Sequence, residues 1–172
     1  MLAFDTPEIV EFWKEACAYL GISEDSRHCA LTFAEPNKET DAATWIDPIA
    51  DNAVNRMKRG TAHLAMQFEK DDIPMRQVGD YWIVLKCDGS PQCVVQIIGI
   101  ETLPFNEVGP IFAASEGDGD LSLKYWQQGH MAQFKDQCRR WNVGWREDYP
   151  VVCESLITVY RPGDTVPPSS PV

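Results

Sequence analysis

Three carboxylates stand at alternate positions in the stretch FAASEGDGD, residues 112–120. Glu116, Asp118 and Asp120 are separated by single glycines, which fit a tight turn. Asp120 has a structural explanation, because aspartate favours the N-cap position and a helical pattern begins at Leu121. Glu116 and Asp118 have no such explanation, so they are candidates for binding or catalysis.

The usual patterns of metal and cofactor sites are absent from the sequence. A calcium loop needs D-x-D-x-D-G with a glutamate at its twelfth position, which this stretch does not provide. The six cysteines form no CxxC pair, so zinc-finger spacing is missing as well. Neither a nucleotide-binding glycine motif nor a nucleophile elbow is present. We therefore expect no metal ion and no other cofactor.

A lysine and a threonine form a second candidate group in MKRGTAHL, residues 57–64. Lys58 is predicted to lie in the last turn of a helix that ends at Gly60, where a cation is favoured. Thr61 then begins a strand, in which a β-branched residue is common. Both residues thus have an ordinary structural explanation, and their spacing alone does not indicate chemistry.

Helix-terminal residues predict where several helices begin and end. Thr6 as N-cap, with proline after it, begins a helix that Gly21 ends. Asp47 is predicted to cap a second helix, whose face carries Ile49, Ala53 and Met57. Two further helices are predicted at 106–115 and over LSLKYWQQGHMAQFKDQCRRW, residues 121–141. The apolar face of the last one carries Leu123, Trp126, His130 and Phe134, and such a histidine is more often structural than catalytic.

Alternating and β-branched patterns predict four strands. They are TAHLAMQF (61–68), DYWIVLKC (80–87), QCVVQIIGIETL (92–103) and VVCESLITVY (151–160). Strands interrupted by helices, with a long hairpin in the middle, indicate an α+β fold. We expect an N-terminal helical extension (1–44) packed on one domain (45–160), followed by a disordered tail (161–172).

The charge of the chain limits its partners. The net charge is -11, and residues 1–55 carry 11 of the 26 acidic residues but only 3 of the 15 basic ones. Such acidity disfavours long duplex nucleic acid, which requires many phosphate contacts. Two local basic groups leave a nucleoside or a short single-stranded RNA as possible partners: Arg56, Lys58 and Arg59, and Lys135, Arg139, Arg140 and Arg146.

Signals for export or membrane insertion are also missing. The N-terminus lacks a basic segment followed by an apolar one, and no run approaches the roughly 18 apolar residues of a membrane span. Scattered cysteines are typical of free thiols in a reducing compartment. We therefore expect a cytoplasmic protein without a membrane partner.

Four stretches in this order resemble the ASCH domain, a family with PUA-like β-barrels. They are KRGTAHL (58–64), VGDYWIVLKCDGSPQCVVQIIGIETLPFNEV (78–108), FAASEGDGDLSLKYWQQGH (112–130) and VVCESLITVY (151–160). The combination of K-x-x-T, G-D-Y, P-F-x-E-V and E-G-x-G-D is specific, and the longer bacterial members also have the N-terminal helix. The resemblance implies a PUA-like small β-barrel of five or six strands with flanking helices.

The same resemblance implies a function and a set of site residues. One small ASCH member is an amidohydrolase that deacetylates N4-acetylcytidine with a lysine, a threonine and a glutamate, and other bacterial members are described as ribonucleases. The three residues correspond to Lys58, Thr61 and Glu116, which are expected to meet in one pocket. We expect Arg59, His63 and Asp118 to bind the substrate beside them, although the family often has a small polar residue in place of His63. The alternative is an RNA-binding module with ribonuclease activity.

Two assignments of the catalytic roles are consistent with these residues. Thr61 can attack an acetyl carbonyl if a base takes its proton. Lys58 is that base only if burial makes it neutral, whereas a nearby Glu116 would keep it protonated. In the second case Glu116 handles the proton and charged Lys58 stabilises the oxyanion.

Overall fold

The structure is a computed structural model that describes residues 6–33 and 43–165. The strands are β1 (His28–Leu31), β2 (Gly60–Leu64), β3 (Tyr81–Leu85), β4 (Pro91–Pro104) and β5 (Pro150–Tyr160). The helices are α1 (Pro7–Leu20), α2 (Ala43–Val54), α3 (Ala65–Lys70), α4 (Pro110–Ser115) and α5 (Leu123–Arg140), with a 3-10 turn η1 (Phe105–Glu107). Most of the predicted tail, residues 166–172, lies outside the described ranges.

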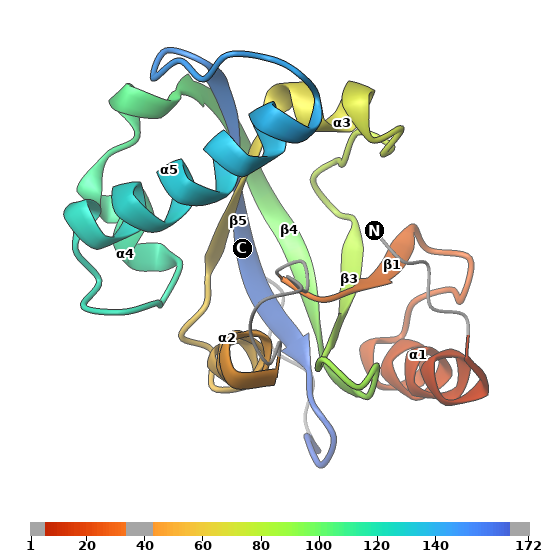
Figure 1. Cartoon of the computed structure of the whole chain (residues 1–172). Coiled ribbons are helices and arrows are strands. Elements are labelled where there is room, and N and C mark those ends of the chain that lie inside the picture. Colours follow the sequence, from red (N-terminus) through yellow and green to blue (C-terminus); the bar gives the residue numbers. More distant parts are fainter. Residues whose placement is uncertain (1–5, 34–42, 166–172) are drawn as a thin grey trace.

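The five strands form one curled sheet in the order β1-β3-β4-β5-β2. Only β1 and β3 are parallel, and all other pairs are antiparallel. The long strands β4 and β5 run together through the centre (Figure 1), and their register shifts at two places, which bends the sheet. Since β1 and β2 are separate edges, the sheet is a half-barrel. The predicted α+β, PUA-like fold with flanking helices is thereby confirmed.

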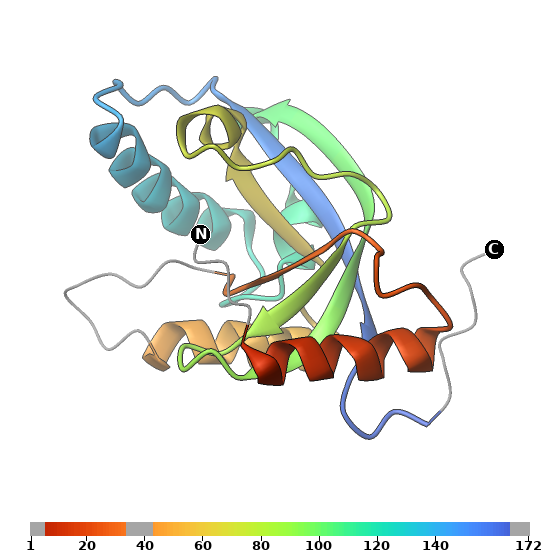
Figure 2. The ribbon, with the colours of Figure 1, turned by 90° about the vertical axis from the view of Figure 1, so that its right-hand side faces the viewer.

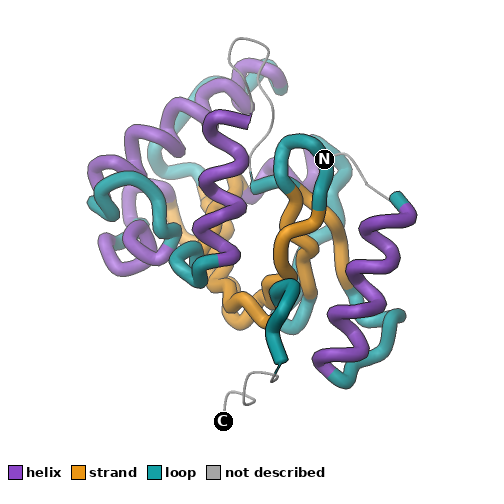
Figure 3. The backbone as a smooth tube through the Cα atoms, turned by 90° about the horizontal axis from the view of Figure 1, so that it is seen from below, coloured by secondary structure: helices purple, strands orange, loops and turns teal. Residues whose placement is uncertain are grey.

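Helices cover the curled sheet from more than one side. Figure 2 shows α5 beside the upper part of the sheet and α1 and α2 along its lower part, and Figure 3 shows the strands between groups of helices. Buried residues of α2 pack against Trp82, Val95 and Leu156 of the sheet. A separate cluster joins α4 and α5 to β2 and to the beginning of β5. Two separate apolar clusters therefore pack these helices against the half-barrel.

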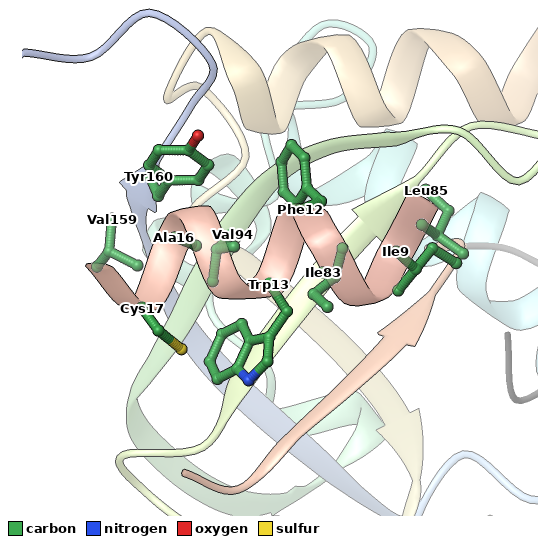
Figure 4. Close-up of a cluster of buried hydrophobic side chains, with 10 residues drawn as sticks. All are labelled: Ile9, Phe12, Trp13, Ala16, Cys17, Ile83, Leu85, Val94, Val159 and Tyr160. Carbon is green, nitrogen blue, oxygen red and sulfur yellow. The ribbon is translucent and has the colours of Figure 1, made fainter. Parts of the chain in front are cut away.

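Helix α1 forms as its sequence predicts. The Thr6 hydroxyl accepts a hydrogen bond from the Ile9 amide at 3.3 Å, and Gly21 adopts the left-handed conformation (φ 68°) that ends the helix. Its buried side chains, Phe12 and Trp13 among them, pack on β3, β4 and β5 (Figure 4). The indole of Trp13 also stacks on the His28 ring, with 4.2 Å between centroids.

The predicted boundaries of α2 are wrong. The helix extends from Ala43 to Val54, so Asp47 is an internal residue whose carboxylate accepts a hydrogen bond from the Cys87 amide. Its buried face carries Ile46, Ala50 and Ala53, while Met57 is half exposed beyond the helix. The chain leaves α2 through Arg56 in a left-handed conformation (φ 62°). Lys58 consequently lies in a connecting segment rather than in the last helical turn.

Three other predicted elements also need correction. The predicted strand TAHLAMQF ends at Leu64, and the remainder forms α3. The predicted helix at 106–115 is divided into η1 and α4. Ser122, and not Asp120, caps α5, since its hydroxyl accepts from the Tyr125 amide while Asp120 accepts from the Ser122 amide.

In the described residues no helix is both long and apolar enough to span a membrane.

Candidate active site

Lys58 and Glu116 form a buried ion pair beside the edge strand β2. The Lys58 ammonium lies 3.1 Å from Glu116 Oε2 and 3.4 Å from Asp118 Oδ2. Only 2% of the Lys58 side chain and 5% of the Glu116 side chain are exposed. The Phe33 ring lies 5.0 Å from the same ammonium, at cation–π distance. Lysine is therefore held here by two carboxylates and an aromatic face.

The Glu116 carboxylate accepts hydrogen bonds on both oxygens. Oε2 faces Lys58, while Oε1 accepts from Trp126 Nε1 at 2.7 Å and lies 3.0 Å from His130 Nε2. Trp126 and His130 are one turn apart on α5, which places both on the same helix face. Burial raises the pKa of Glu116, but Lys58, His130 and Trp126 outweigh it and hold this pKa well below its ordinary value. Glu116 is thus a fixed, ionised carboxylate.

Close backbone contacts bring the two segments of this site together. The Arg59 amide donates to the Ser115 carbonyl, and Asn52 Nδ2 donates to the Gly117 carbonyl at 3.0 Å and to Asp118 Oδ1 at 3.2 Å. Gly117 has φ 75°, and a Cβ atom there would lie 2.6 Å from the Met57 carbonyl oxygen. The glycine after Glu116 is therefore needed for the approach that lets Glu116 reach Lys58.

Thr61 and His63 lie on β2, at positions that face the interior of the half-barrel. Thr61 is 4% exposed and is the register partner of Glu154 on β5. Within the described residues, no hydrogen bond joins its hydroxyl to Lys58 or Glu116. Burial, together with Arg76, lowers the pKa of His63 to about 3. His63 is therefore a neutral ring, whose Nε2 accepts from Arg76 at 3.2 Å.

A second buried polar group consists of Glu154, Arg76 and His63. Glu154 is completely buried, and its Oε2 accepts from Arg76 Nη1 at 3.1 Å. The Arg76 guanidinium lies over the Trp82 ring, 4.0 Å from its centroid. Glu154 Oε1 has no hydrogen-bond partner in the described part of the chain. Burial raises the pKa of Glu154 to about 7, although Arg76 opposes this shift.

A cavity of about 340 Å³ opens beside this second group. It shares Arg76 and Trp82 with the Glu154 group but is not lined by Lys58, Thr61 or Glu116. Its other lining residues are Arg27, His28, Cys29, Ile73, Pro74, Asp80 and Tyr81. The volume lies within the usual range for small-molecule sites.

The structure brings some of the predicted site residues into contact and separates others. The Lys58 ammonium contacts both Glu116 and Asp118, as the convergence of Lys58 and Glu116 requires. The Arg59 residue is exposed, and only its backbone contacts the segment of Glu116. Thr61 and His63 lie near Glu154, and His63 is also within electrostatic range of Glu116.

Four residues of these two groups were not predicted from the sequence. They are Asn52, Arg76, Trp126 and Glu154, and His130 was interpreted as a structural histidine. Trp126 and His130 carry a usable signal, because a polar ring on an apolar helix face so soon after Glu116 needs a partner. Glu154 carries another, since it is the sole charged residue of an otherwise apolar strand pattern.

The described residues contain no cluster of three histidine, cysteine, aspartate or glutamate side chains arranged to hold a metal ion. All six cysteines are free thiols.

The ion pair predicts a specific pH dependence of stability. Because the folded pKa of Glu116 is depressed, its stabilising contribution is present above the ordinary value of 4.5 and is lost as pH falls below it. Glu116→Gln is expected to lower the free energy of unfolding by about 3 kcal/mol at neutral pH, since it leaves buried Lys58 without its main partner. Urea unfolding at a series of pH values measures both effects.

The control for this prediction is Glu107→Gln, which changes an exposed glutamate of η1. Its stability and pH dependence should equal those of the wild type. If Glu116→Gln were as stable as the wild type at neutral pH, the ion pair would not have the assigned role.

Comparison with known proteins agrees with this architecture. The family model of the ASCH domain matches residues 38–160. An ASCH domain structure from Lactobacillus crispatus JV V101 is similar over 93% of this chain and 100% of its own, with a TM-score of 0.78 and 29% identity. A protein from Enterococcus faecalis V583 is similar over 92% of this chain and 96% of its own, with a TM-score of 0.74 and 19% identity. A search of curated proteins gave no match. The chain belongs to the ASCH domain family.

Proposed function

We propose that this protein is an amidohydrolase that removes the acetyl group from N4-acetylcytidine. The observation that carries the proposal is the buried Lys58–Glu116 pair, since K-x-x-T and the later glutamate are the residues by which the chain resembles the deacetylating ASCH member. Family membership supports an RNA-related or hydrolytic function in general. The acetylated nucleoside is the more specific part of the proposal.

The contacts of Lys58 favour a role as a charged group. An ammonium is the form that pairs with carboxylates, and here it has Glu116 and Asp118 as partners. Its contacts at 3.4 Å, to Asp118 and to the Glu116 carbonyl, are the long ones. A substrate carbonyl oxygen would replace one of them and would be stabilised as it becomes an oxyanion. Glu116 then orients Lys58.

Burial favours a small reacting group over a phosphodiester. Lys58, Thr61 and Glu116 are each no more than 4% exposed. Enzymes that modify a base bind it in a closed pocket after extruding it from the strand. The phosphodiester of a strand lies on its outside, and strand binding needs several phosphate contacts, which an acidic chain disfavours.

The test is to incubate the protein separately with N4-acetylcytidine and with a short unmodified single-stranded RNA. Chromatography should detect cytidine and acetate from the first, and the RNA should remain intact. A preparation that cleaves the RNA but releases no acetate from any acetylated nucleoside would overturn the proposal in favour of ribonuclease activity.

A further inference from the structure

We propose that Glu154 is the proton acceptor for the Thr61 hydroxyl in this reaction. The proposal rests on the amidohydrolase function above and adds a catalytic residue outside the Lys58–Glu116 pair. It arises from the position of Glu154 in the sheet and from its unpaired carboxylate oxygen.

The strand register places the two side chains next to each other. In the antiparallel pair of β2 and β5, Thr61 is directly opposite Glu154. Directly opposite residues point to the same face of a sheet, with Cβ atoms about 4.5–5.5 Å apart. On the neighbouring strand β4, the register partner of Glu154 is Ile100, which packs in the hydrophobic cluster beneath α2. The register thus makes Glu154 the cross-strand neighbour of Thr61 on the same face of the sheet, and among the described residues no hydrogen bond yet joins its Oε1 to the Thr61 hydroxyl.

The two bases considered from the sequence are poorly suited to this task. Glu116 already accepts from Lys58 and Trp126 and contacts His130, so a proton on this carboxylate would disrupt existing hydrogen bonds. Lys58 pairs with two carboxylates, which favours its charged form. Glu154 differs from both, because its Oε2 is fixed by Arg76 while its Oε1 is free of partners among the described residues.

The surroundings of Glu154 suit a base that works near neutral pH. Two charged groups near Glu154, Arg76 and Asp80, come from the segment before β3. Three other titratable groups lie near it: His63 on β2, Cys29 on β1 and Cys153 on β5. The pKa of His63 is lowered to about 3, and burial raises the pKa values of Cys29 to about 11 and of Cys153 to about 12. The pKa of Glu154, raised to about 7, falls between pH 5 and 9.

The proposed step balances with water as the sole co-reactant. Thr61 Oγ1 forms a bond to the acetyl carbon, its proton passes to Glu154 Oε1, and the carbonyl electron pair moves onto oxygen. The C–N bond then breaks, and Glu154 returns the proton to the leaving nitrogen, which gives cytidine. Water next attacks the Thr61 acetyl ester and gives its proton to Glu154. The ester C–O bond breaks, the proton passes to Thr61 Oγ1, and acetic acid leaves as acetate.

The test compares pH profiles of kcat/KM for N4-acetylcytidine between pH 5 and 9. The wild type should lose activity on the acidic side with a midpoint near 7, as Glu154 becomes protonated. Glu154→Gln should be about 10²- to 10⁴-fold slower and should lack this limb. Glu154→Asp, which keeps a carboxylate, should recover part of the rate. An acidic limb that survives in Glu154→Gln overturns the proposal.

The matched control is Glu101→Gln, an exposed glutamate on β4 that is the register partner of Cys153. Its rate and pH profile should equal those of the wild type. If Glu154→Gln does not fold, Glu154→Asp provides the test. The proposal requires that the acidic limb of its pH profile be shifted from that of the wild type. An unchanged rate and limb in Glu154→Asp would count against Glu154.

A second assay separates failure of this proposal from failure of the proposed function. p-Nitrophenyl acetate supplies an activated acetyl group, and peptide mass spectrometry detects acetylation of Thr61. Acetylation of Thr61 that depends on Glu154 supports Glu154 as the proton acceptor, even if N4-acetylcytidine is not hydrolysed. Acetylation at the same rate in Glu154→Gln, or no acetylation of Thr61 in the wild type, overturns it.

Discussion

Lys58→Met is expected to lower kcat for N4-acetylcytidine hydrolysis by about 10²- to 10³-fold, the usual cost of removing one oxyanion donor. Methionine retains most of the length of the lysine stem but has no N–H group. Glu116 would keep its two partners on α5, Trp126 and His130, so its position should change little. Steady-state kinetics with the nucleoside measures the effect, and thermal unfolding shows whether the variant is folded.

The matched control for this variant is Lys14→Met on α1. Lys14 is half exposed, and its ion pair with Glu11 among the described residues is long, at 3.9 Å. Its kcat should equal that of the wild type. An unchanged kcat in Lys58→Met, with only KM raised, would mean that Lys58 binds the substrate without stabilising the transition state.

The second large effect concerns Thr61. Thr61→Ala should lower kcat by at least about 10³-fold, because residues that act as one unit fail together when the nucleophile is removed. Thr61→Ser retains a hydroxyl and should restore part of the rate. The measurement is kcat for the three proteins, combined with acid quenching of the wild type during turnover to detect an acetyl group on Thr61.

Thr158→Ala provides the control for loss of a buried threonine. Thr158 lies on β5, and its hydroxyl donates to the Ala53 carbonyl at 2.7 Å. Its removal should lower the free energy of unfolding by about 1 kcal/mol and leave kcat unchanged. If Thr61→Ala behaved like Thr158→Ala, Thr61 would be a structural residue of β2.

Local signals were sufficient where a helix or strand is determined by its own residues. Helix α1 follows from Thr6 and Gly21, and the long strands β4 and β5 follow from their β-branched composition. Asp47 and Asp120 were wrongly predicted as helix N-caps, because aspartate caps helices well but also accepts hydrogen bonds from other amides. One accepts from Cys87, forty residues away, and the other accepts from Ser122.

The candidate site depends on contacts that no local pattern contains. Lys58 and Glu116 could be paired only through family resemblance, because 58 residues separate them in the chain. The pairing of β2 with β5, which sets Thr61 opposite Glu154, is likewise a property of the sheet order. Arg76 reaches Glu154 across 78 residues, from a segment without regular secondary structure.

The most direct test of the Lys58–Thr61–Glu116 assignment follows the acetyl group itself. N4-acetylcytidine labelled with ¹³C at the acetyl carbonyl is incubated with the wild type and with Thr61→Ala, and NMR spectra are recorded over time. The wild type should convert the amide carbonyl signal into an acetate signal of equal intensity, and Thr61→Ala should leave it unchanged. An amide signal that persists with the wild type, or that disappears equally fast with Thr61→Ala, would contradict the assignment.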